Sequence, residues 1–147
     1  EYVARAWSTA LHGRPGPVVL VLPEDMLRDE VEAVDRPQVP RFAQAADPLA
    51  VAAMMDMLKD AAAPLAIVGG AGWCAATAHH FAAWAERVGI PVAAAFRRQD
   101  AVPNDCAVYA GNLGYGPNPK LVERVRAADL LLVLGARLGE ATTDGYT

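Results

Sequence analysis

The chain has 147 residues, a mass of 15.5 kDa and a formal net charge of -4, which suits a protein with one ordinary hydrophobic core. Hydrophobic residues make up 54% and charged residues 20%, which excludes disordered, collagen-like and disulfide-scaffold proteins. The mildly acidic chain has no basic stripe, so we expect no nucleic acid partner, and its apolar runs are too short to insert in a membrane. No secretory signal is apparent and Cys74 and Cys106 form no disulfide framework, so we expect a cytoplasmic protein.

The first 46 residues predict a helix, a strand and a linker. Apolar residues at three-to-four spacing predict an amphipathic helix over residues 2–12. The continuous β-branched apolar run at residues 18–22 predicts a strand that is covered on both faces. Residues 24–46 are polar and show no sustained period, so we expect a linker and a domain boundary there.

The remaining residues alternate helices with strands. The expected elements are a helix over 48–62, a strand over 65–68, a helix over 75–88, a strand over 90–96, a long loop over 97–118, a helix beginning at Pro119 and a strand over 129–134. Each strand is a continuous apolar run, which indicates a parallel sheet with helices on both faces. The predicted fold class is therefore α/β, with a Rossmann-like domain over residues 47–147.

A glycine turn after the first strand of this domain is the clearest motif. Gly70, Gly72 and Ala75 satisfy G-x-G-x-x-A between a strand and a helix, directly after Gly69. In this context glycines let the backbone approach a pyrophosphate, and the helix N-terminus offers free amides. The alternative is a tight turn that packs closely and binds nothing.

Phe96, Arg97 and Arg98 follow the next strand. A nicotinamide-binding fold places an acidic residue there to hold the ribose, so the sequence does not favour ordinary nicotinamide binding. Two alternatives stand for the arginines: they bind a phosphate, or they form a solvated pair or an ion pair within an interface.

Further glycines surround the last helix and strand. The carboxyl ends of parallel strands lie at the same edge of a sheet, so we expect these turns to meet. The candidate cofactor-binding residues are Gly69, Gly70, Gly72, Phe96, Arg97, Gly111, Gly114, Gly135, Ala136 and Arg137.

Candidate catalytic residues are not evident in the sequence. Ser8 has no nucleophile motif around it, and His79 and His80 have no further metal ligand at a suitable spacing. No pair of carboxylates stands out as a general acid and base. We therefore expect a binding or spacing domain with no catalytic residue and no metal site.

An ordered set of segments resembles the thiamine-diphosphate-dependent enzymes of the acetolactate synthase-like group. Residues 13–25, Gly-Arg-Pro-Gly-Pro-Val-Val-Leu-Val-Leu-Pro-Glu-Asp, resemble the closing strand of their pyrimidine-binding domain. The segments that resemble their central domain are residues 64–72, 89–92, 102–105 and 128–137. The resemblance covers essentially the whole chain.

This resemblance implies a domain organisation. Residues 1–23 are expected to be the C-terminal helix and strand of the pyrimidine-binding domain, residues 24–46 a linker, and residues 47–147 a central domain that is truncated at its C-terminus. We expect residues 1–23 to be poorly anchored without the rest of their domain. Both ends of the chain look cut, so we expect a piece of a longer protein.

The resemblance also implies an activity for the full-length protein. Thiamine diphosphate and Mg²⁺, bound by domains outside this chain, would cleave or form a bond next to the carbonyl of a 2-oxo acid. The full-length protein is expected to be a homodimer or homotetramer, and the fragment alone is expected to be inactive.

Central domains of this family bind FAD, an ADP-like nucleotide or nothing. The glycine turns named above match the flavin-side turns of the family, including its Gly-Ala-Arg. The segment at residues 95–98 departs from the pattern by carrying arginine where flavin-binding members carry glycine, and Ala141 stands where a second arginine is common. Two alternatives stay open: a free-standing FAD- or NAD(P)-binding domain of an oxidoreductase, and a structural spacer with exposed Trp73, Trp84 and Tyr115.

Overall fold

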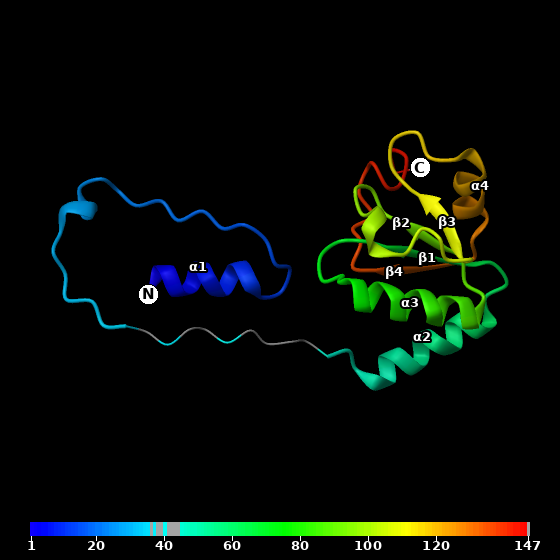
Figure 1. Ribbon diagram of the computed structural model, residues 1–147, viewed down its shortest axis with the longest axis horizontal. Helices are drawn as coiled ribbons and strands as arrows, with labels where there is room; N and C mark the ends of the chain where they lie inside the picture. The colour runs from blue at the N-terminus through cyan, green and yellow to red at the C-terminus, as the bar shows by residue number, and fades with distance from the viewer. Residues whose placement is uncertain (36, 38–39, 41–44, 147) are drawn as a thin grey trace. The chain divides into compact units, whose positions relative to one another are not determined.

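The computed structural model describes residues 1–35, 37, 40 and 45–146 (Figure 1). The chain divides into two compact units, Glu1–Ala46 and Asp47–Thr147. Among the described residues, no helix combines the length and the apolar character that a membrane span requires.

The first unit contains helix α1, Tyr2–Leu11, and a single 3-10 turn, Met26–Arg28. His12 follows α1 and its ring Nδ1 donates to the carbonyl oxygen of Ser8 at 2.8 Å. The same carbonyl oxygen also accepts from the backbone amide of His12 at 3.0 Å, so the imidazole adds a second hydrogen bond at the end of the helix.

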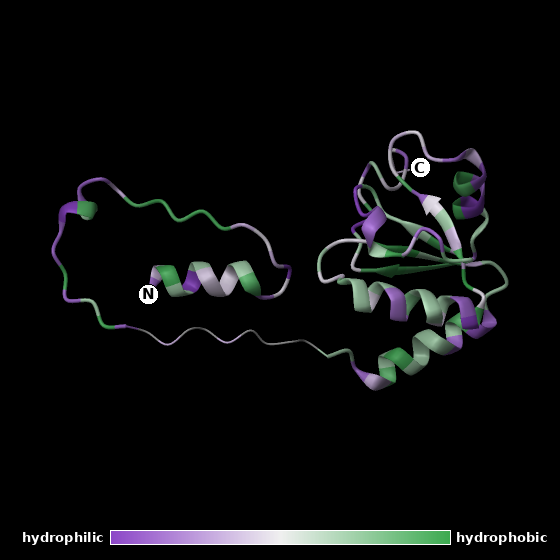
Figure 2. Cartoon of the chain, in the orientation of Figure 1, coloured by the Kyte–Doolittle hydropathy of each residue, from purple (hydrophilic) through white to green (hydrophobic). Residues whose placement is uncertain are grey.

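The prediction of a strand at residues 18–22 is wrong, because these residues form no strand in the structure. The run is extended but is paired with no strand among the described residues, and its side chains are exposed, with Val19 at 85% and Val21 at 79%. Figure 2 shows this run as a hydrophobic stretch outside any sheet. A strand forms only where a neighbouring strand accepts its hydrogen bonds, and this unit supplies none.

The second unit is built on a four-stranded parallel sheet. Its strands are β1, Pro64–Val68; β2, Val92–Ala94; β3, Tyr109–Asn112; and β4, Leu130–Leu134. The strand order is β3-β2-β1-β4 and all three pairings are parallel. The sheet confirms the predicted α/β class.

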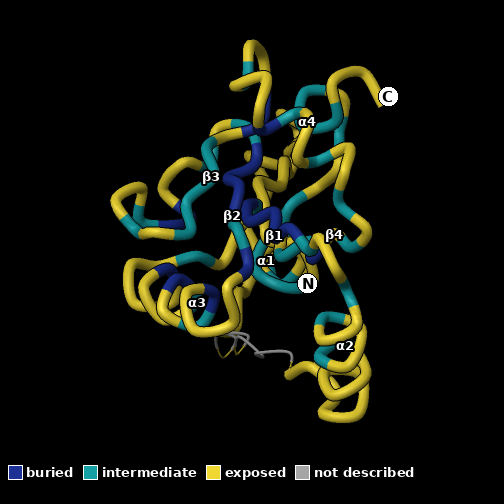
Figure 3. Tube along the Cα trace, turned by 90° about the vertical axis from the view of Figure 1, so that its right-hand side faces the viewer, coloured by how far each residue is buried: buried dark blue, intermediate teal, exposed yellow. Residues whose placement is uncertain are grey.

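Helices cover both faces of the sheet, as predicted (Figure 1). The helices are α2, Pro48–Asp60; α3, Ala75–Val88; and α4, Pro119–Ala127. Ala66 and Val68 of β1 pack in the cluster formed with α2 and α3, whereas Ile67 packs on the α4 side. This alternation follows from the two-residue period of a strand, and Figure 3 shows the buried residues concentrated along β1, β2 and the inner side of α3.

Residues with a known preference for helix ends cap the three helices of this unit at one end each. Asp47 and Asn118 are the N-caps of α2 and α4, and their side chains accept from the amides of Leu49 at 3.1 Å and Lys120 at 2.9 Å. Gly89 ends α3 in the left-handed conformation, at φ 71°, where a residue without Cβ carries no steric penalty.

The loop predicted over residues 97–118 is partly wrong, because it contains β3 and a 3-10 turn at Gln99–Ala101. The strand Tyr109–Asn112 has no continuous apolar run and is only half-buried. It forms because β2 offers a free edge, and the register shifts between Val92 and Ala93 to accommodate it. Trp73 and Trp84 are half-buried against the core, contrary to the prediction that they are exposed, whereas Tyr115 is exposed.

Candidate functional site

The carboxyl ends of β1, β2 and β4 meet at one edge of the sheet, as predicted. The amide of Gly69 donates to Leu134 at 3.1 Å, and the amide of Ala95 donates to Val68 at 2.8 Å. A Cβ placed on Gly69 would lie 2.7 Å from Cβ of Ala95 and 3.3 Å from Cβ of Ala136. We call the residues in this contact, Gly69, Gly70, Ala95, Gly135 and Ala136, the glycine rim.

The glycine rim lies at the topological switch point of the sheet. From β1 the chain proceeds to β2 and β3 on one side, and then returns to place β4 on the other side of β1. Open α/β sheets bind ligands in the crevice outside the carboxyl ends of strands at such a point. The rim is therefore the place where a nucleotide would be expected.

Gly70 and Gly135 touch backbone to backbone across this switch point. Both have positive φ, 71° and 67°. A Cβ on Gly70 would collide with the carbonyl oxygen of Gly135, and a Cβ on Gly135 would lie 2.6 Å from the carbonyl oxygen of Gly69. Close packing of the chain on itself thus requires both glycines, and the binding of a pyrophosphate at the G-x-G-x-x-A turn stays a prediction.

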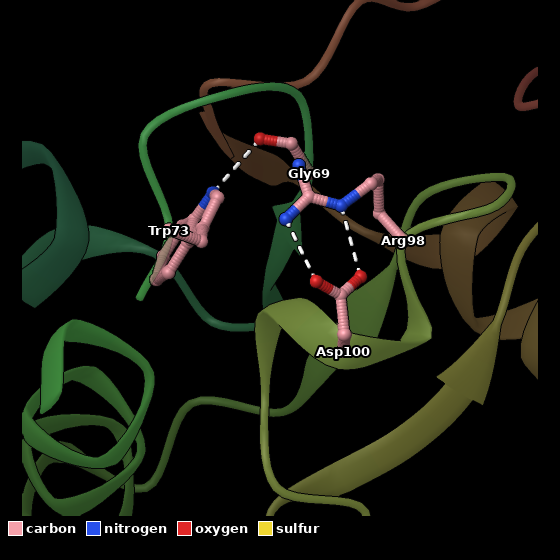
Figure 4. Close-up of polar contacts among 4 residues, drawn as sticks. All are labelled: Gly69, Trp73, Arg98 and Asp100. Atoms are coloured by element: carbon pink, nitrogen blue, oxygen red, sulfur yellow. Dashed lines mark hydrogen bonds and ion pairs between the residues drawn. The ribbon is translucent and has the colours of Figure 1, made fainter. Parts of the chain in front are cut away.

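Trp73 is hydrogen-bonded to the glycine turn. Sequence reasoning did not identify it as a site residue. Its Nε1–H donates to the carbonyl oxygen of Gly69 at 2.8 Å (Figure 4). Its ring also contacts Phe81 of α3 edge to face, with centroids 5.6 Å apart. The only sequence signal for this contact is a tryptophan four residues after Gly69, and that spacing is not specific.

Arg98 is held by Asp100 in a two-pronged ion pair. Nε and Nη2 of Arg98 donate to the two carboxylate oxygens at 2.9 and 3.0 Å (Figure 4). The Arg98 side chain is only 25% exposed, whereas that of Asp100 is 70% exposed. Hydrogen bonding to Arg98 holds the pKa of Asp100 below its usual value. The structure therefore shows Arg98 in an ion pair within the chain, and phosphate binding by Arg97 and Arg98 stays a prediction.

Phe96 forms an aromatic cluster with the loop that contains Gly114 and Tyr115. The guanidinium of Arg97 lies 5.0 Å from the centroid of the Phe96 ring, and Tyr115 meets the same ring edge to face at 5.2 Å. A Cβ on Gly114 would lie 2.6 Å from Cδ2 of Phe96. Gly114 thus makes room for a side chain of the protein itself, and Arg97, at φ 61°, adopts a backbone conformation that favours glycine.

The other candidate residues are not gathered at the rim contact. Gly111 lies in β3, where an added Cβ would be 3.4 Å from Leu121 of α4. Gly72 has open space around it, and Arg137 is exposed. The structure brings together four of the ten candidates at the rim, Gly69, Gly70, Gly135 and Ala136. Two others, Phe96 and Gly114, contact each other. The cofactor-binding role of all ten stays a prediction.

A cavity of about 240 Å³ lies on the α4 side of the sheet. Its lining is mostly apolar and includes Ile67, Leu113, Val125 and Leu131. Nucleotide and drug-sized ligands occupy pockets of roughly 300–1,000 Å³, so this cavity is smaller than such a ligand needs.

The described residues include no cluster of three or more His, Cys, Asp or Glu side chains that could hold a metal ion. No step through thiamine diphosphate can be assigned to these residues.

Comparisons with known proteins agree with the architecture. Residues 51–147 match the family model described as "Thiamine pyrophosphate enzyme, central domain". The chain is 33% identical to the acetolactate synthase large subunit of Parasynechococcus marenigrum over 96% of its length, covering 24% of that relative. It is 29% identical to the sulfoacetaldehyde acetyltransferase of Alcaligenes xylosoxydans xylosoxydans, covering 95% of the chain and 23% of the relative. It is 35% identical to the sulfoacetaldehyde acetyltransferase of Rhodobacter capsulatus, covering 88% and 22%.

The chain spans about a quarter of the length of these curated relatives. Its second unit has the parallel α/β sheet that the resemblance implied, and the family match covers nearly all of that unit. The chain belongs to the thiamine pyrophosphate enzyme family and carries its central domain.

Proposed function

We propose that this chain is the central region of a thiamine-diphosphate- and Mg²⁺-dependent enzyme that acts on 2-oxo acids, in the manner of an acetolactate synthase. The observation that carries the proposal is the family match over residues 51–147, supported by relatives named acetolactate synthase that align with essentially the whole chain. Thiamine diphosphate, when bound, would supply the ylid that allows a bond next to the substrate carbonyl to be cleaved or formed.

This chain contributes position rather than catalysis. The packed sheet and its helices would hold neighbouring domains at fixed places. We propose that the fragment alone is inactive, and that the full-length protein is a cytoplasmic homodimer or homotetramer. In that assembly residues 1–23 would complete a pyrimidine-binding domain.

A second substrate class is favoured by the other group of relatives. Several proteins named sulfoacetaldehyde acetyltransferase are as similar to the chain as those named acetolactate synthase, with identities of 35% and 33% in the examples above. We therefore test the full-length protein against two classes of substrate. Pyruvate represents the 2-oxo acids, and sulfoacetaldehyde is a sulfonated aldehyde.

The experiment is an assay of the purified full-length protein after removal of bound cofactor and metal. We expect turnover of pyruvate to return only when thiamine diphosphate and Mg²⁺ are both added. If the protein turns over sulfoacetaldehyde and not pyruvate, the proposed cofactor stands and the proposed 2-oxo acid substrate is wrong. Absence of thiamine-diphosphate-dependent turnover of either compound would contradict the proposal. The isolated residues 1–147 serve as the control and should stay inactive under every condition.

A further inference from the structure

The cavity on the α4 side of the sheet is lined mainly by aliphatic side chains. Ile67 of β1 and Leu131 of β4 come from the sheet, Val122 and Val125 come from α4, and Leu113 comes from the segment between β3 and α4. Burying a charged or unpaired polar group against such a wall is unfavourable, whereas burying hydrocarbon is favourable. The inner part of the cavity therefore suits an aliphatic chain.

The size of the cavity limits what it can hold. Its volume is about 240 Å³, and one water molecule occupies roughly 30 Å³ of the liquid. The cavity thus has room for a molecule of roughly eight non-hydrogen atoms, such as a branched chain of about four carbons with a small polar head.

The charged groups of the lining lie where the cavity opens to solvent. Among the described residues of the lining, the charged side chains are Arg126 of α4 and Asp144, and they are 63% and 67% exposed, whereas Ile67 and Leu113 are buried. Nη2 of Arg126 lies 3.9 Å from Oδ2 of Asp144, which exceeds the roughly 3.2 Å limit of a good N–H···O hydrogen bond. The opening therefore presents a positive and a negative group side by side, with no hydrogen bond between these two atoms.

This pair of opposite charges selects the head group of a ligand. A carboxylate attracted by Arg126 would be repelled by Asp144 if it carried no positive charge, and an amine attracted by Asp144 would be repelled by Arg126 in the same way. A zwitterion with both charges on neighbouring atoms is attracted by both side chains. We propose that this cavity binds a free aliphatic α-amino acid, with its side chain among the aliphatic residues, its carboxylate on Arg126 and its ammonium on Asp144.

The first test is calorimetric titration of the full-length protein with L-leucine, which should bind with a Kd of about 1 mM. Three probes each lack one part of leucine: 4-methylpentanoate lacks the ammonium, 3-methylbutylamine lacks the carboxylate, and L-serine lacks the hydrocarbon chain. Each should bind at least about tenfold more weakly than leucine. No saturable binding of leucine up to about 20 mM, or equal affinity for any of the three probes, would overturn the proposal.

Asp144→Asn tests the head group directly. The variant should bind leucine at least about tenfold more weakly, and should bind 4-methylpentanoate more tightly than the wild type does, because the repulsion of its carboxylate is removed. Arg126→Gln should weaken leucine binding to a similar extent. Arg124→Gln, on the same helix but outside the cavity lining, is the matched control and should bind leucine as the wild type does. If Asp144→Asn leaves the preference for leucine over 4-methylpentanoate unchanged, the proposal is wrong.

A second pair of variants tests the place of binding. Ala141 is a half-buried residue of the lining, so Ala141→Leu should fill part of the cavity and weaken leucine binding at least about tenfold. Ala83→Leu, at an exposed position of α3 on the other side of the sheet, should leave it unchanged. If leucine binds equally well to a folded Ala141→Leu protein, as checked by circular dichroism, the ligand does not occupy this cavity.

Binding at this cavity goes beyond the proposed function and does not depend on it. The titrations are done without thiamine diphosphate and Mg²⁺, so a protein that binds leucine but shows no thiamine-diphosphate-dependent turnover would contradict the proposed function alone. A protein that turns over pyruvate only with thiamine diphosphate, and that does not bind leucine, would contradict the amino acid site alone.

Discussion

At the scale of single residues, glycine at the rim is a packing requirement. Gly70 and Gly135 approach so closely that a Cβ on either would meet carbonyl oxygen. The sequence predicted that the strand ends would meet, because the carboxyl ends of parallel strands share an edge. It could not tell a cradle for a ligand from a contact within the chain, because both need glycine at positive φ.

Gly70→Ala should destabilise the second unit by about 3 kcal/mol, because the new methyl group meets backbone that cannot move aside as a flexible side chain would, and because φ is positive. Gly139→Ala is the matched control. Gly139 has open space around it and no positive φ, so its free energy of unfolding should change by less than about 0.5 kcal/mol. Urea unfolding of both variants measures the difference, and equal stabilities would show that the rim contact is not tight.

Asp129 joins the starts of β1 and β4, a role that sequence reasoning did not assign. Its carboxylate accepts from the amides of Ala62 at 2.7 Å and Ala63 at 2.9 Å. These hydrogen bonds, that of Ala63 most strongly, lower the pKa of Asp129 below its usual 3.8. A carboxyl whose pKa falls on folding stabilises the native state at higher pH, and this stabilisation is lost as the pH drops from about 4 through the lowered folded pKa.

Asp129→Asn should therefore lower Tm at pH 7, because an amide can accept only one of the two hydrogen bonds. The difference in Tm from wild type should shrink as the pH falls below about 4. Glu123→Gln, at an exposed position of α4, is the control and should not show this pH dependence. Thermal unfolding across the pH range measures it, and a constant difference in Tm at all pH values would exclude the assigned hydrogen bonds as the cause.

At the scale of elements, helices were better predicted than strands. Caps mark helix ends in the local sequence: Asp47 and Asn118 precede proline, and Gly89 follows α3. Strands depend on partners that are distant in sequence. Residues 18–22 are apolar but unpaired, whereas Tyr109–Asn112 pairs with β2 despite a weak pattern. The sequence thus indicates which segments are apolar, and only the sheet decides which of them are strands.

Asn118→Ala should cost about 1 kcal/mol in the free energy of unfolding, because the amide of Lys120 loses its acceptor at the N-terminus of α4. Asn118→Asp keeps an acceptor and adds a negative charge at the positive end of the helix dipole. It should match or exceed the wild type in urea unfolding. Equal losses in both variants would mean that the side-chain cap does not stabilise α4.

At the scale of the whole molecule, the chain combines a packed unit with one that leaves apolar surface exposed. Figure 2 shows hydrophobic residues within the sheet of the second unit and along residues 18–22 of the first. The chain spans about a quarter of the length of these relatives, and the assignment of residues 1–23 to a pyrimidine-binding domain stays a prediction. An exposed, extended apolar segment that pairs with no strand is a site of association between copies.

Val21→Lys should therefore reduce aggregation of the isolated chain, because it places a charge within the unpaired run. Val31→Lys changes an equally exposed valine, 78% against 79% for Val21, outside that run and serves as the control. Light scattering as a function of time and concentration measures the effect. If both substitutions suppress aggregation equally, added charge is the cause and the run at residues 18–22 has no special role.

The central claim is that the chain is part of a thiamine-diphosphate-dependent enzyme. Calorimetric titration of the cofactor-free full-length protein with thiamine diphosphate tests this claim most directly. The account predicts saturable binding that requires Mg²⁺ and that disappears when the metal is chelated. A folded full-length protein that takes up no thiamine diphosphate in the presence of Mg²⁺ would contradict it.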